Sequence, residues 1–136
     1  MSVTKETLKD GEILVYLKNE FLKNQTEDNL IPLMSCLHDS VVLVPMNLPK
    51  NNVSNPKPDI LQNGKSFYLP VFSQEKQISK NYRTNLNFVE KTLLESIQIA
   101  RNINADGLVL DPFTEHMIIS FDIAEIIEVM PSQLED

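Results

Sequence analysis

SFYLPVFS, at Ser66–Ser73, is the stretch that decides the fold of this chain. VVLVP at Val41–Pro45 and GLVLDPF at Gly107–Phe113 have the same character. In each run, both alternating sets of side chains are largely hydrophobic. Apolar runs of this length are typical of strands that are covered on both faces. The three runs therefore predict a sheet that is packed against other elements.

Between these strands, apolar residues recur at helical spacing. The first predicted helix runs from a cap at Asp10 to about residue 23, and the second runs from Asp28 or Asn29 to Ser40. A third helix is predicted over 88–103, with Asn87 and Glu90 as reciprocal caps, and a fourth over 121–129 after Ser120. A shorter helix over 74–80 is expected after a cap at Ser73.

Turn residues predict two hairpins. Asn63-Gly64 favours a two-residue type I′ turn, in which both residues have positive φ. Pro70 cannot donate to a strand ladder, so it predicts a bulge or an edge in the second strand of that hairpin. The turn at Asp111–Thr114 predicts that a strand over 116–119 runs antiparallel to the strand over 108–110.

The length of 136 residues suits one domain. We expect a single α+β (mixed α/β) domain, with a mixed sheet of four to five strands and helices packed on it. Three segments are expected to lie outside this core: a flexible lead-in over 1–9, an exposed loop over 46–58 and an acidic tail over 131–136.

The charge balance argues against several classes of partner. The chain has 12 basic and 19 acidic residues, a net charge of −7 and no basic block. Nucleic acid and anionic membranes both attract clusters of Lys and Arg, so neither is expected as a partner. Cys36 is the one cysteine, which fits a reducing compartment. With no signal-like apolar segment near the start and no membrane-length apolar run, we expect a cytoplasmic protein.

Motifs for cofactors and metals are absent from the sequence. Its three glycines are far apart, and it has no C-x-x-C, H-E-x-x-H or G-x-S-x-G pattern. We therefore predict no cofactor, no metal and no catalytic residue. Cys36 is interpreted as a small buried hydrophobe, and His38 as a residue that caps the C-terminal end of a helix.

One group of polar residues keeps an enzymatic alternative open. Asp106 and Asp111 lie at opposite ends of a predicted strand, so only Asp111, Glu115 and His116 can share a hairpin end. Carboxylates beside a histidine can perform acid–base chemistry or bind a divalent metal. Asp-Pro is equally ordinary turn chemistry, which is the interpretation that we favour.

Aromatic residues suggest a second kind of site. Tyr68 and Phe72 share one face of their strand, and they are either core residues or part of a partner-binding patch. The candidate interaction surface comprises Tyr68, Phe72, Asp111, Phe113, Glu115 and His116. On the last helix, Asp122, Glu125 and Glu128 are expected to form a solvated face.

Three segments together resemble the N-terminal domain of the bacterial SseB family. These are LIPLMSCLHDSVVLVP at Leu30–Pro45, ILQNGKSFYLPVFS at Ile60–Ser73 and GLVLDPFTEHMIIS at Gly107–Ser120. The resemblance spans roughly residues 12–130 and implies one domain of this type. The family has no agreed enzyme activity, so the resemblance implies no catalytic residues.

These observations lead to two functional hypotheses. The first is a non-enzymatic cytoplasmic module, accessory or regulatory, that contacts a protein partner or a second copy of itself. Strand addition at an open sheet edge is the expected mode of contact. The alternative is a small hydrolase or metal-assisted enzyme that uses Asp111, Glu115 and His116.

Overall fold

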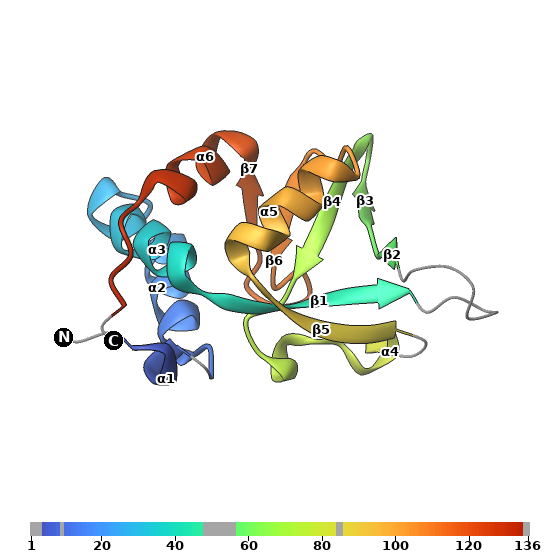
Figure 1. Cartoon of the computed structure of the whole chain (residues 1–136), viewed down its shortest axis with the longest axis horizontal. Helices are drawn as coiled ribbons and strands as arrows, with labels where there is room; N and C mark the ends of the chain where they lie inside the picture. The colour runs from blue at the N-terminus through green and yellow to red at the C-terminus, as the bar shows by residue number, and fades with distance from the viewer. Residues whose placement is uncertain (1–3, 9, 48–56, 84–85, 135–136) are drawn as a thin grey trace.

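The computed structural model describes residues 4–8, 10–47, 57–83 and 86–134, which form an α+β domain (Figure 1). In chain order the elements are α1 (Lys5–Leu8), α2 (Glu12–Lys23), α3 (Glu27–Asp39), β1 (Val41–Asn47), β2 (Lys57–Pro58), β3 (Leu61–Asn63), β4 (Ser66–Val71), η1 (Glu75–Gln77), α4 (Lys80–Arg83), β5 (Leu86–Thr92), α5 (Leu93–Asn102), β6 (Gly107–Leu110), β7 (Met117–Ser120) and α6 (Phe121–Val129). The predicted α+β class is therefore confirmed.

The strands form two sheets instead of the single sheet predicted. Within the described residues, one sheet has the order β2–β1–β5 and the other has the order β3–β4–β6–β7. Both pairings of the first sheet are antiparallel. In the second sheet β4 and β6 run parallel, whereas β3 and β7 are antiparallel to their neighbours. A reciprocal pair of 2.9 Å backbone hydrogen bonds between Leu43 and Phe72 joins the two sheets.

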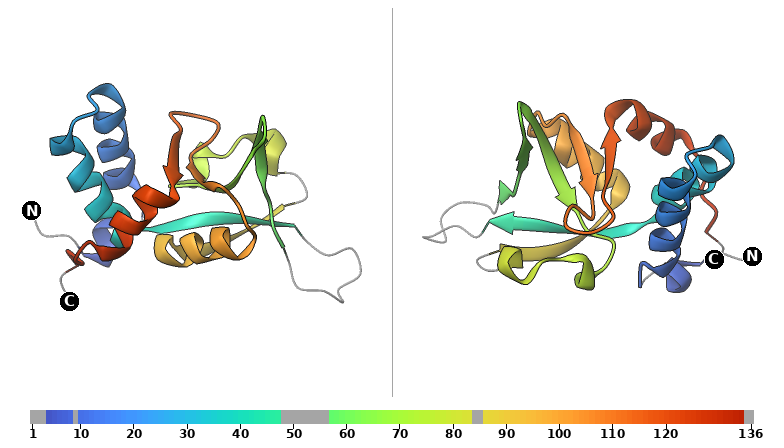
Figure 2. Two further views of the ribbon diagram at one scale, coloured as in Figure 1. Left: turned by 90° about the horizontal axis from the view of Figure 1, so that it is seen from above. Right: turned by 180° about the vertical axis from the view of Figure 1, so that it is seen from behind.

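The inner face of the four-stranded sheet holds much of the core. Fully buried side chains from its three longer strands line this face: Leu69, Val71, Leu108, Leu110 and Ile119. Helix α5 contacts β4 and β6, and α6 contacts β7. The view from behind shows the sheet in front of α5 (Figure 2, right). The three apolar runs of the sequence are thus strands, as predicted.

The prediction of a helix from residue 88 is wrong, because residues 86–92 form β5. This strand pairs with β1 along all seven of its residues, from Val41↔Thr92 to Asn47↔Leu86. Helix α5 begins only after Thr92, whose side chain accepts a hydrogen bond from the Glu95 amide while the Glu95 carboxylate accepts one from the Thr92 amide. This capping box lies five residues beyond the predicted one, and pairing with β1 outweighs the helical spacing of residues 88–92.

The first hairpin forms with its turn one residue later than predicted. Asn63 pairs with Ser66, so Gly64 and Lys65 form the turn, and only Gly64 has positive φ. The turn is therefore not the predicted type I′, which needs positive φ at both positions. Pro70 fits the predicted edge, because β3 pairs only with residues 66–68 and the next contact on that side of β4 is at Phe72.

The N-terminal helices differ from expectation at their ends. Within the lead-in that was predicted to be flexible, the described residues 4–8 contain α1 and a buried Leu8. Gly11 occupies the N-cap of α2, although an Asp10 carboxylate oxygen still accepts a hydrogen bond from the Glu12 amide. Helix α3 follows Thr26 and ends at Asp39, as predicted to within two residues.

Other segments were predicted with mixed success. Met46, Asn47 and residues 57–58 belong to strands, and the rest of the predicted loop, residues 48–56, lies outside the described residues. Ser73 caps no helix, because the short 3₁₀ helix η1 follows Gln74. Ser120 caps α6 as predicted. No helix in the described residues is long and apolar enough to span a membrane.

Replacing Thr92 with Ala should destabilise the domain by about 1 kcal/mol, because the substitution removes the side-chain oxygen that accepts the Glu95 amide. Thr26→Ala is a matched control, since Thr26 also precedes a helix but its side chain makes no capping hydrogen bond. Urea unfolding of both variants measures the difference. Equal losses of stability would contradict the role given to the capping box.

Candidate functional site

A buried ion pair connects α2 to the carboxyl end of β6. Lys18 Nζ lies 2.8 Å from Asp111 Oδ2, and the two side chains are 1% and 0% exposed. Ser73 completes the cluster: its amide donates to Asp111 Oδ1 at 2.8 Å and its hydroxyl donates to Oδ2 at 2.7 Å. A buried carboxylate is tolerated only when its charge and lone pairs are matched in this way.

The backbone around this cluster is equally constrained. Asp111 has a φ of +52°, and its amide donates to the Val71 carbonyl at 2.9 Å. Gly11, which precedes α2, has a φ of +75°, and a Cβ atom there would lie 2.3 Å from the Ser73 carbonyl oxygen. The start of α2 can therefore approach the chain after β4 only where residue 11 has no side chain.

Lys18 was not among the residues predicted to form a site. The signal was present: Lys18 lies four residues after Leu14 and one after Leu17, inside the apolar stripe of α2. A lysine in such a stripe predicts a buried acidic partner, because lysine is almost never fully buried unpaired. The sequence could not identify that partner, which lies 93 residues away.

The residues predicted to form an interaction surface are divided between the core and separate surface regions. Phe72 and Asp111 are 0% exposed, so their assignment to a surface is wrong. Tyr68, Phe113 and His116 do lie together around a shallow depression of about 270 Å³. Glu115 lines a different depression, with Asn19, Leu22 and Lys23 of α2. Asp111, Glu115 and His116 therefore do not converge.

Phe72 is instead the centre of an aromatic cluster. Its ring centroid lies 5.9 Å from that of Tyr82, 5.9 Å from that of Phe88 and 6.0 Å from that of Phe113. Tyr82 also donates a hydrogen bond to Asp59, and burial together with this carboxylate raises the pKa of the tyrosine far above its usual range. The cluster joins the two sheets and α4 beside the Leu43–Phe72 contact, and it supports the core interpretation of Phe72.

The two residues near the end of α3 have structural contacts. Cys36 is buried, and desolvation raises the pKa of its thiol. His38 Nδ1 donates to the Ile127 carbonyl in α6 at 2.8 Å, so it links two helices, whereas it was predicted to cap its own. Among the described residues, no three His, Cys, Asp or Glu side chains are grouped so that they could hold a metal ion.

The predicted solvated face of α6 is only partly free of contacts. Asp122 and Glu125 are exposed. Glu128 instead forms a bidentate pair with Arg101 of α5, at 2.7 and 2.8 Å, which lowers the pKa of the Glu128 carboxyl. This pair connects α5 and α6.

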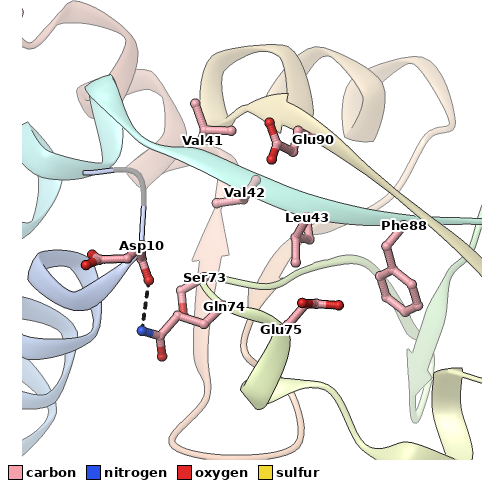
Figure 3. Close-up of a pocket in the computed structure, with 9 residues that line it drawn as sticks. All are labelled: Asp10, Val41, Val42, Leu43, Ser73, Gln74, Glu75, Phe88 and Glu90. Atoms are coloured by element: carbon pink, nitrogen blue, oxygen red, sulfur yellow. Dashed lines mark hydrogen bonds between the residues drawn. The ribbon is translucent and has the colours of Figure 1, made fainter. Parts of the chain in front are cut away.

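A more open site lies where the outer face of the β1–β5 pair meets the chain that follows β4 (Figure 3). This pocket has a volume of about 350 Å³. Its lining residues are Asp10, Val41, Val42, Leu43, Ser73, Gln74, Glu75, Phe88 and Glu90. Gln74 closes one side by donating to the Asp10 carbonyl oxygen at 2.9 Å, as the dashed line in Figure 3 shows. Carboxyl groups give the lining a negative charge, and no described lining residue is basic.

The pocket borders the outer edge of β5, which pairs with no other strand among the described residues. Leu43 directs its amide and carbonyl to Phe72, and the Pro45 carbonyl accepts the Asp59 amide, so the peptide groups of both residues point away from β5. Their partners in the antiparallel register are Glu90 and Phe88. In an antiparallel ladder such pairs are not hydrogen-bonded, so the amides and carbonyls of Phe88 and Glu90 point outward. β5 is the terminal strand of its sheet in the described structure.

The described residues thus form an α+β domain with two sheets, a buried ion pair between α2 and the end of β6, and a terminal strand, β5, whose outer edge pairs with no other described strand. The family model for the SseB protein N-terminal domain matches residues 17–124. The chain therefore belongs to the SseB family, in agreement with the resemblance of its strand segments. No curated protein and no solved structure matches the chain.

Lys18→Met should destabilise the domain by about 3–5 kcal/mol, because it leaves the Asp111 carboxylate buried without its counter-charge. Lys76→Met is the matched control: the Lys76–Glu12 pair is 3.4 Å long, with side chains 67% and 61% exposed, and its removal should change stability little. Chemical unfolding measures both effects. If Lys18→Met were as stable as the control, the ion pair would have no structural role.

Proposed function

We propose that the chain is a non-enzymatic, cytoplasmic protein-contact domain that binds an extended segment of a partner along the free edge of β5. The observation that carries this proposal is the pair of outward peptide groups at Phe88 and Glu90. Unpaired amides and carbonyls on a terminal strand are a template for an added strand. In strand addition these groups provide affinity, and adjacent pockets that hold alternate side chains provide specificity.

The pocket beside β5 is suited to holding alternate side chains of such an added strand. Phe88 and Glu90 project from the face of β5 that lines it, together with Val41 and Leu43 of β1 (Figure 3). Every second side chain of an added strand would lie on this face. The exposed carboxylates of Asp10 and Glu90 favour a lysine or arginine there over an acidic residue. The overall net charge of −7 acts in the same direction.

The enzymatic alternative gains no support from the geometry. Its key residue, Asp111, is already bound by Lys18 and Ser73 and is 0% exposed. Glu115 and His116 are exposed and line different depressions. Binding, which needs only exposed donors, acceptors and apolar area, is therefore the function that we propose.

The edge contact can be tested by photocrosslinking in the native host. A photoreactive amino acid at Val41, which is 45% exposed and lines the pocket, should give a discrete adduct with the partner. Glu90→Pro should abolish the adduct, because proline removes an outward amide that β1 does not use. An adduct of twice the mass of the chain would identify a second copy as the partner.

Two controls make this experiment decisive. The same photoreactive group at Ile126 of α6, which is 44% exposed, reports on accidental contacts. Circular dichroism shows whether Glu90→Pro retains the fold. No adduct above that from position 126, or an adduct unaffected by folded Glu90→Pro, would reject the β5 edge as the contact site.

A further inference from the structure

A second surface lies between the two long N-terminal helices, which pack side by side (Figure 1). It is an open groove of about 750 Å³. One wall is a single face of α2, formed by Glu12, Ile13, Tyr16 and Leu17, and the opposite wall is a face of α3. That second wall comprises Ile31, Pro32, Ser35, Cys36 and Asp39. No residue that lines this groove also lines the pocket beside β5.

Two large apolar side chains are exposed in the groove. Tyr16 is 62% exposed and Ile31 is 52% exposed, one on each wall. Leu8, which is buried, and Met130, which is half-buried, also line the groove. A contiguous apolar surface of this kind with a polar rim is characteristic of an interaction site.

The charges around the groove indicate the chemistry of its occupant. Two acidic side chains line the groove: Glu12, whose carboxylate also contacts Lys76 and Gln74, and Asp39, which also accepts a hydrogen bond from the Gln133 amide. Of the two lysines on these helices, Lys18 is buried in its pair with Asp111, which leaves Lys23 as the exposed one. None of the described residues that line the groove is basic, so its charged lining residues are both acidic and a cationic partner is favoured there.

We propose that this groove binds an amphipathic helix of a partner protein, with its apolar face in the channel and lysine or arginine residues along its flanks. A helix placed in a groove uses anchors at i, i+3, i+4 and i+7, and two parallel walls of helix faces suit such a row. Basic flanks lie against the carboxylates of Asp39 and Glu12, the two acidic residues that line the groove. The groove and the β5 edge are separate surfaces, so this proposal does not depend on the strand contact.

The test titrates the isotopically labelled full chain with two synthetic peptides and follows backbone amide shifts. Both peptides carry leucines at i, i+3, i+4 and i+7, and their polar positions are lysine in one and glutamate in the other. The lysine peptide should shift the amides of Tyr16, Ile31 and Ser35 and bind at least roughly tenfold more tightly than the glutamate peptide. Shifts confined to Phe88 and Glu90 would instead report on the strand edge and count against the groove.

Substitution then locates the binding. Ile31→Lys should lower the affinity for the lysine peptide by roughly tenfold or more, because it removes an apolar anchor and adds a charge of the same sign as the peptide. Ile126→Lys, at a similarly exposed position outside the groove, should leave the affinity unchanged. If Ile31→Lys does not fold, Tyr16→Ser replaces it. Failure of the lysine peptide to bind, equal binding of both peptides, or unchanged affinity in the folded groove variant would overturn the proposal.

Discussion

The ammonium group of Lys18 and the carboxylate of Asp111 are buried together as an ion pair, and the arrangement of α2, β4 and β6 depends on this pair. Each charge would be costly to bury alone, so both are buried only where the helix and the strand end are in contact. Ser73 extends the constraint to the chain after β4 through both oxygens of the carboxylate. One aspartate thus fixes a helix, a parallel strand pair and the segment that leads to the β5 pocket.

The connection between the two sheets is close to this cluster. Phe72 precedes Ser73, exchanges backbone hydrogen bonds with Leu43 and packs its ring against Tyr82, Phe88 and Phe113. Because Leu43 directs its peptide groups to Phe72, its β5 partner Glu90 directs its own to the outside. The register that builds the core therefore also determines which peptide groups of β5 remain available for a partner.

Local sequence patterns correctly predicted those helices and strands that are determined by residues close together in the sequence. The buried strands, the β6–β7 hairpin and the Ser120 cap all follow from short stretches. The segment over 88–92 was mistaken for the start of a helix because its apolar spacing suits either structure, and its pairing with β1 is a contact between distant parts of the chain. Lys18 escaped notice for the same reason, since its partner is 93 residues away. The site predicted from the sequence consisted of aromatic residues and carboxylates in a turn. The proposed contacts instead depend on backbone groups of β5 and on a groove, and both exist only in the folded chain.

Native-state hydrogen exchange at the Ser73 amide is the most direct test of the central claim. This amide donates to the Asp111 carboxylate, so it reports on the buried cluster without any substitution. We predict that it exchanges only through global unfolding, with the same free energy of opening as the amide of Leu110 in β6. Exchange of Ser73 at a clearly lower free energy, while Leu110 stays protected, would show that the cluster opens by itself and does not hold the fold together.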